Sequence, residues 1–187
     1  MGAAHGIVMA KLPALLLLVA LPAGADECRA VDAGSGRVGF EIRQAGAPFR
    51  GEFRRFGGEL CLQGERVARI DVWLEPASVE TELPEVDAAL KDREFFDVAA
   101  HPRLRFTSDA VEARGDSQLA RGVLEIKGRR RDVQVPFRLQ AAGGGLAVAG
   151  SIVLNRLDFG IGTGEWSNTR WLGGEVKVDF SAPLARR

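Results

Sequence analysis

The sequence predicts an all-β protein, an eight-stranded antiparallel β-barrel with a short helical insertion. Two observations lead to this fold class. Apolar and polar residues alternate over most of the chain after residue 36, and turn-forming residues separate the alternating runs. Only residues 83–97 place apolar side chains at helical spacing instead. Consecutive strands joined by short turns favour an antiparallel sheet, and eight strands can close into a barrel.

Residues 1–25 are expected to be a Sec signal peptide that directs export to the periplasm and is then cleaved. Lys11 precedes an apolar run at residues 12–21, and residues 23–25 are small, as a signal peptidase requires. The apolar run is much shorter than the roughly 20 residues that span a bilayer. A retained membrane anchor is therefore the less favoured alternative.

Residues 26–187 are expected to form one barrel domain with a disulfide bond. Cys28 and Cys61 are the only cysteines, and an oxidising compartment favours a bond between them. Lipidation of Cys28 is disfavoured, because Asp26 and Glu27 stand where a lipobox needs small and apolar residues. Two free thiols are the remaining alternative.

The predicted strands follow one another along the domain. In the first, residues 37–44, Val38, Phe40 and Ile42 share one face. A second stretch covers residues 49–62, with Phe49, Gly51, Phe53, Gly58, Leu60 and Leu62 on one face and a break at residues 54–57. Later runs place their inward faces at Ile70, Val72, Leu74, Leu104, Phe106, Ser108, Leu124, Ile126, Val133, Val135, Phe137, Leu139, Leu146, Val148, Gly150, Ile152, Leu154, Val176, Val178 and Phe180.

The connections between these strands are of two kinds. Residues 83–97 are predicted to form one short helix or two helical turns that end before Pro102. Residues 113–118 and 127–132 are predicted turns. The second of these, KGRRRD, is the one basic cluster; a solvated hairpin turn is the favoured interpretation and an anion site the alternative. A lipocalin-like barrel is the favoured architecture, with a flattened sandwich as the second possibility.

The composition offers little for catalysis or for binding nucleic acid. The chain has 25 basic and 25 acidic residues, so its net charge of zero gives no electrostatic footprint for nucleic acid. His101 is the one histidine after residue 25, and a histidine metal site or a Ser-His-Asp triad would lack partners. An inward Ser108 or Ser151 would supply only an unassisted hydroxyl group. We expect no enzyme and no metal site.

The stretch NRLDFGIGTGEW, residues 155–166, contains a D-F-G triplet and a glycine-spaced loop. A kinase would also need an H-R-D loop and a strand lysine over a longer chain. A dinucleotide site would need a helix directly after the glycines, and SNTRW has no helical pattern. The glycines are therefore expected to shape a loop before the last strand, where Trp166 or Trp171 would line or plug a barrel mouth.

Several longer stretches resemble one known family. They are VDAGSGRVGFEIRQAGAPFRGEF, FFDVAAHPRLRFTS, GVLEIKGRRRDVQVPF, LNRLDFGIGTGEW and LGGEVKVDFSAPL. From about Val31 to Leu184 they resemble, in order and spacing, the YceI-like family of polyisoprenoid-binding, lipocalin-like periplasmic proteins. The chain departs from the family at KGRRRD, where relatives commonly carry His-Gly-Val-Thr-Lys-Pro, and at GTGEW. That loop and AGAPFRGEF resemble a sub-branch sometimes fused to a membrane b-type cytochrome.

The resemblance implies a carrier for a long isoprenoid lipid, polyprenyl or quinone-like, held inside the barrel. The same apolar faces would also suit a packed core that holds nothing. Arg54, Arg55 and Arg93 are candidates to meet a polar head group. The predicted lipid-binding residues share an inward apolar position or the mouth loop: Phe40, Ile42, Phe53, Val72, Leu74, Phe106, Leu124, Val135, Phe137, Ile152, Trp166 and Phe180.

The expected partners follow from the same resemblance. The first is the isoprenoid lipid itself, and no other cofactor is expected. A ligand-free module that assists a membrane redox protein, such as a b-type cytochrome, is the alternative function. A second copy of the chain, in a homodimer, is a further candidate partner, and nucleic acid is not.

Overall fold

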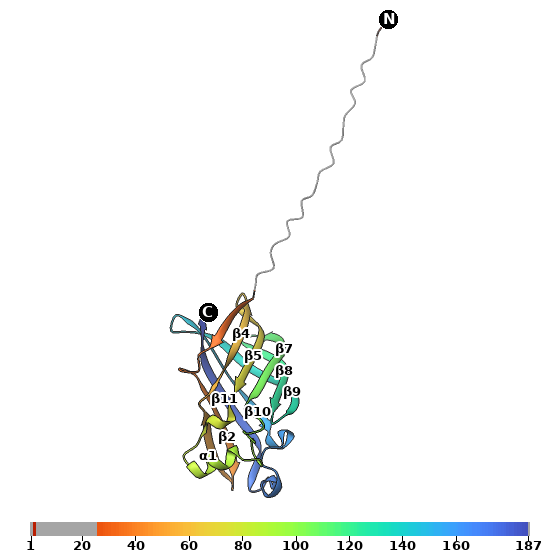
Figure 1. Cartoon of the computed structure of the whole chain (residues 1–187). Helices are drawn as coiled ribbons and strands as arrows, with labels where there is room; N and C mark the ends of the chain where they lie inside the picture. Colours follow the sequence, from red (N-terminus) through yellow and green to blue (C-terminus); the bar gives the residue numbers. More distant parts are fainter. Residues whose placement is uncertain (1, 3–25, 187) are drawn as a thin grey trace.

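The computed structural model describes Gly2 and residues 26–186, and Figure 1 shows how their strands are arranged. The predicted signal peptide, residues 1–25, lies outside the described residues apart from Gly2. Within the described part of the chain, no helix is both long and apolar enough to cross a membrane.

Eight long strands form the fold, and the first three are each interrupted once. The first long strand consists of β1 (Glu27–Val31) and β2 (Arg37–Gln44). The second consists of β3 (Ala47–Phe53) and β4 (Phe56–Gln63), and the third of β5 (Arg66–Leu74) and β6 (Val79–Glu80). The break predicted at residues 54–57 is the second interruption, which the structure places at Arg54 and Arg55. The third interruption contains the short 3-10 helix η1 (Pro76–Ser78). Pro76 is buried there and has no backbone N–H to donate to a neighbouring strand.

The other five long strands are continuous. They are β7 (Leu104–Arg114), β8 (Ser117–Ile126), β9 (Arg129–Ala142), β10 (Gly145–Asn155) and β11 (Leu172–Arg186). The turn predicted at residues 113–118 joins β7 to β8. The predicted turn at residues 127–132 is wrong in length: Lys127 and Gly128 alone make it, both with positive φ, and the next residue begins β9.

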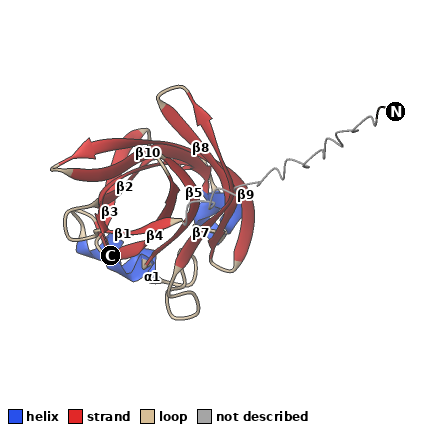
Figure 2. Cartoon of the chain, turned by 90° about the horizontal axis from the view of Figure 1, so that it is seen from above, coloured by secondary structure: helices blue, strands red, loops and turns tan. Residues whose placement is uncertain are grey.

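Hydrogen bonds join neighbouring strands in chain order, and β11 closes the ring. Along one edge β11 pairs with β10; along the other it pairs first with β2 and then with β1. Every pair is antiparallel, and Figure 2 shows the strands as a ring. This confirms the predicted eight-stranded barrel, and the alternative of a flattened sandwich is wrong.

The helix α1 (Pro84–Lys91) lies between β6 and β7, at the end of the barrel opposite the C-terminus (Figure 1). Proline at its first position, acidic residues in its first turn and Lys91 in its last turn suit a helix and its dipole. Asp87 Oδ1 accepts hydrogen bonds from the backbone N–H and the hydroxyl of Thr81, at 2.8 and 2.7 Å, which ties α1 to the residue directly after β6. The helix is shorter than the predicted segment, because bends and turns follow Asp92.

Two groups of buried apolar residues fill the two ends of the barrel. The larger, which we call the closed-end cluster, includes Leu60, Val67 and Leu184. The smaller, which we call the mouth cluster, consists of Ile42, Phe95 and Leu172 with partly buried neighbours. The mouth cluster lies at the end covered by α1, the residues after it, and the loop before β11.

Candidate functional site

A cavity of about 540 Å³ lies inside the barrel, bordered by residues of both clusters. Its volume falls within the roughly 300–1,000 Å³ usual for sites that bind small organic molecules. The structure places all twelve residues predicted to bind lipid around this one cavity: Phe40, Ile42, Phe53, Val72, Leu74, Phe106, Leu124, Val135, Phe137, Ile152, Trp166 and Phe180. The barrel therefore contains an apolar compartment that could hold a long apolar group.

Aromatic side chains from separate segments close the mouth of this cavity. Phe95 is buried and packs against Trp166, with ring centroids 5.5 Å apart. Phe96 meets Phe53 edge to face at 5.8 Å, and Phe53 also contacts Phe40 at 5.5 Å. Phe95 and Phe96 are not among the site residues predicted from the sequence. Two adjacent phenylalanines in an otherwise charged segment, residues 91–97, were the available signal.

A glycine makes room for one of the lining rings. Gly150 on β10 lies opposite Phe180 on β11, and a Cβ at Gly150 would lie 2.5 Å from Cζ of that ring. The ring therefore lies against the bare backbone of the neighbouring strand. A larger residue at position 150 would clash with this ring and, also at 2.5 Å, with the backbone carbonyl oxygen of Pro136.

Arg156 holds the loop that borders the mouth. Its side chain is 2% exposed, and each of its five N–H groups donates to a backbone carbonyl. The acceptors, at 2.6–2.8 Å, are the carbonyls of Ile161, Gly162, Trp166, Leu172 and Gly173. Burial lowers the pKa of Arg156, but a guanidinium group remains charged at neutral pH. This side chain thus fixes both Trp166 and the start of β11.

The glycine-spaced stretch serves this arrangement. Asn155 caps the short helix η2 (Arg156–Phe159) by accepting from the N–H of Leu157, and Gly160 ends it with a φ of 66°. Gly162 also has a φ of 66°, and a Cβ there would lie 2.6 Å from Nη1 of Arg156. A second short helix, η3 (Gly164–Ser167), completes the loop. Phe159 and Gly160 of the D-F-G triplet therefore have structural roles, with Phe159 buried beside the cavity and Gly160 ending η2.

Three other predicted candidates lie away from the cavity. Ser108 accepts a hydrogen bond from the N–H of Ile70 at 2.8 Å, and Ser151 bonds to Asp179 on the next strand. Neither serine borders the cavity, so the idea that either faces a ligand there is wrong. Trp171 is 54% exposed, so of the two tryptophans predicted for the mouth it is Trp166 that lines the cavity.

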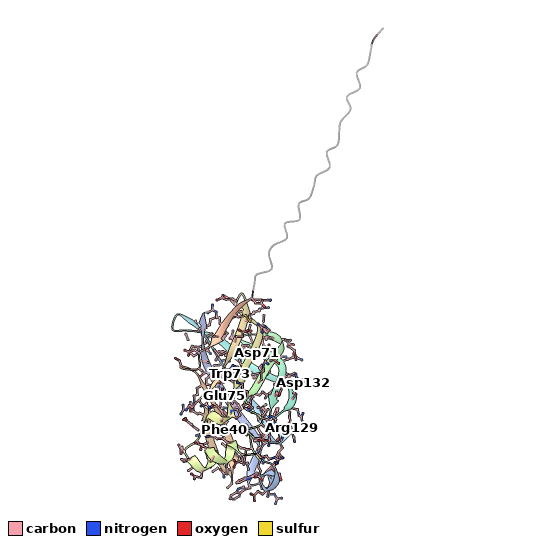
Figure 3. The ribbon with its side chains drawn as sticks, viewed as in Figure 1. Phe40, Asp71, Trp73, Glu75, Arg129 and Asp132 are labelled. Atoms are coloured by element: carbon pink, nitrogen blue, oxygen red, sulfur yellow. A yellow bond between two sulfur atoms is a disulfide. The ribbon has the colours of Figure 1, made fainter. Side chains whose placement is uncertain are left out.

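The arginines predicted to meet a head group do not border the cavity either. Arg54 pairs with Glu80 at 2.7 Å, and Arg55 pairs with Glu75 at 2.5 Å. Figure 3 shows Glu75 in line with Asp71 and Trp73 along β5 and its continuation. These two arginines therefore complete ion pairs on the outer surface.

Arg93 borders a second, polar hollow of about 440 Å³ outside the mouth. Lys127 in its wall donates to the carbonyls of Arg93 and Gly160, at 2.6 and 3.1 Å. Burial is the main cause of the lowered pKa of Lys127. Arg129, labelled in Figure 3, lies over Gly160 in the same hollow. The basic turn thus connects two loops of the mouth.

The two cysteines form the expected disulfide bond. Cys28 on β1 and Cys61 on β4 are direct neighbours in the strand register. The bond therefore joins β1 to β4 near the closed-end cluster.

Known proteins match both the sequence and the fold. At 26% identity, the crystal structure of BcnA from Burkholderia cenocepacia superposes with a TM-score of 0.77 over 82% of this chain and 98% of that one. A polyisoprenoid binding domain from Saccharophagus degradans shares the fold at 15% identity, with a TM-score of 0.69 over 85% of this chain and 98% of that domain. A UPF0312 protein of Pseudomonas savastanoi is 30% identical over 143 residues, which are 71% of this chain and 74% of that protein.

The family comparison covers most of the barrel. The model of the YceI-like domain matches residues 30–184, from within β1 to near the end of β11. This range includes residues of all eight long strands, the helix α1 and the loop held by Arg156. The chain therefore belongs to the YceI-like domain family.

Proposed function

We propose that this protein binds a long isoprenoid lipid, polyprenyl or quinone-like, with the tail inside the barrel. The observation that carries the proposal is the cavity of about 540 Å³ with its apolar wall. The Saccharophagus degradans domain, which has the same fold, is described as polyisoprenoid binding, and this supports the proposal. Burying an apolar tail gains about 0.8 kcal/mol per CH₂ group, so few polar contacts are needed for affinity.

We also propose that the protein acts as a carrier in the periplasm, after cleavage of residues 1–25. The charged-then-apolar pattern at residues 11–21 and the small residues at 23–25 support this location. N-terminal sequencing of the exported protein should then begin at Asp26. Protein that stays in the cytoplasm with these residues attached would contradict the proposed location.

The experiment that tests the binding proposal is mass spectrometry of an organic extract. The full chain would be expressed, exported and purified from the periplasm without detergent. We expect an isoprenoid at close to one molecule per protein. A Phe106→Trp variant, which narrows the cavity, should carry less of it after the same purification. A folded native protein that yields no isoprenoid and takes none up from added lipid would overturn the proposal.

A further inference from the structure

Six residues with charged, amide or hydroxyl side chains border the cavity, and three of these side chains point outward. Arg37, Arg105 and Ser181 each precede or follow an inward-facing residue on their strand, so alternation turns their side chains to the outer face. Arg37 pairs there with Glu52 at 2.6 Å, and Nε of Arg105 donates to Asp71 at 2.8 Å. None of the three offers a polar group to a molecule inside.

A fourth polar residue, Arg156, faces inward but has no donor to spare. All five of its N–H groups are used by backbone carbonyls. A phosphate bound in this barrel would need N–H donors or a free cation to replace its hydration. Among the residues of 26–186 that border the cavity, no cationic side chain has a free N–H directed inward.

The remaining two polar residues, Gln44 and Glu85, lie at the mouth. Gln44 ends β2 on the same face as Phe40 and Ile42, and it pairs with Leu172 of the mouth cluster. It is half-buried, and its amide makes no hydrogen bond to any described residue. Glu85 is the second residue of α1, is exposed, and has no hydrogen bond or ion pair within residues 26–186. A free amide and a free carboxylate therefore border the cavity where a head group would emerge.

From these contacts we infer that the mouth selects isoprenoids with an uncharged head group over phosphorylated ones, with Gln44 and Glu85 as the selecting residues. The inference rests on the proposed function and makes its substrate class narrower. A hydroxyl or carbonyl head can accept a hydrogen bond from the amide of Gln44, and a hydroxyl can donate to the carboxylate of Glu85. A diphosphate at the mouth would be repelled by that carboxylate, and the cationic residues Arg93, Lys127 and Arg129 of the second hollow do not border the cavity.

The test compares ligands that share one tail and differ only in the head. Farnesol, farnesyl diphosphate and the hydrocarbon farnesene would each be titrated into the full-length protein and followed by calorimetry. We expect farnesol to bind about tenfold more tightly than farnesyl diphosphate, or more. Equal affinity, or tighter binding of the diphosphate, would overturn the inference. If no ligand bound, including farnesene, the proposed function itself would fail.

Two variants test whether Glu85 and Gln44 cause the preference for an uncharged head group. Glu85→Gln should raise the affinity for farnesyl diphosphate several-fold while farnesol changes by less than about twofold. Glu82→Gln is the matched control, since it removes an exposed acid that does not border the cavity and should change neither affinity. Gln44→Leu should weaken farnesol and leave farnesene unchanged. Selection that persists in both variants would remove these residues from the mechanism.

Discussion

Phe95 and Trp166 meet across the mouth of the cavity, with ring centroids 5.5 Å apart and ring planes at 55°. One ring comes from the turns after α1 and the other from the loop before β11. A tail that enters the cavity by this end must separate them or pass beside them. For the proposed ligand, we therefore expect this contact to slow exchange.

Replacing one ring should speed that exchange. Trp166→Ala removes the larger ring and should increase the dissociation rate of radiolabelled farnesol by about tenfold or more, measured by dilution into unlabelled ligand. Trp171→Ala is the control, because that tryptophan is exposed and does not border the cavity. An unchanged rate for Trp166→Ala in a folded protein would show that the tail leaves elsewhere.

Filling the cavity should weaken binding of the tail. Phe106 and Phe137 both border it, and Phe106→Trp or Phe137→Trp would occupy space that a tail requires. We expect each change to cost about 1–3 kcal/mol of farnesene affinity by calorimetry. Val153→Trp makes a comparable change at an exposed position of β10 and should leave affinity unaltered. If both inward variants fold and bind farnesene as the native protein does, the tail lies outside this cavity.

Removing the guanidinium group of Arg156 should destabilise the mouth loop. Arg156→Met leaves five backbone carbonyls without their donor, and we expect a loss of more than about 3 kcal/mol in the free energy of unfolding. Urea denaturation would measure it, and hydrogen exchange should increase within residues 161–173. Arg170→Met, in the exposed part of the same loop, should be nearly neutral. Native-like stability of Arg156→Met would show that water replaces the donors at little cost.

The ion pair between Asp71 and Arg105 should make stability depend on pH. The hydrogen bond from Arg105 is the main reason that the pKa of Asp71 lies below its ordinary value of 3.8. A lowered pKa in the folded state stabilises the protein above the unfolded pKa, and this stabilisation is lost as pH falls through the folded pKa.

The matching variant is Asp71→Asn. At pH about 7 it should be less stable than the native protein by roughly 1 kcal/mol or less, because the pair lies at the surface. Below the folded pKa the difference should shrink, since the native Asp71 is then protonated and has lost its ion pair. Urea denaturation at both pH values measures this. A difference that stays constant between them would mean that the pair contributes nothing through charge.

The barrel could be predicted from the sequence because its strands alternate so regularly. Residues 37–44 show the principle, since one face carries Val38, Phe40 and Ile42. The first strand, β1, was not predicted, because its sequence ECRAV is short and lacks a clear apolar face. Its place comes from long-range pairing with β4 and β11, which a local pattern does not contain.

The apolar wall of the site could be predicted for the same reason, but the mouth could not. Gln44 continues the inward face of its strand, yet a glutamine at a strand end usually indicates solvent. From the sequence alone Arg156 would be assigned to the surface. Its burial depends on five backbone carbonyls that lie up to 17 positions away in the chain. Contacts of this kind depend on how a loop closes, and residue spacing alone does not report them.

The three interrupted strands are neighbours in the ring, and this has a consequence for the range of ligands. The five continuous strands form an unbroken frame, whereas β2, β3 and β6 form a panel joined to the closed end through breaks at residues 32–36, 54–55 and 75–78. β2 also pairs with the continuous strand β11, so the panel is held along one edge and is interrupted only toward the closed end. For the lipid proposed above, we therefore expect a thicker or branched tail to displace this part of the wall before the continuous strands.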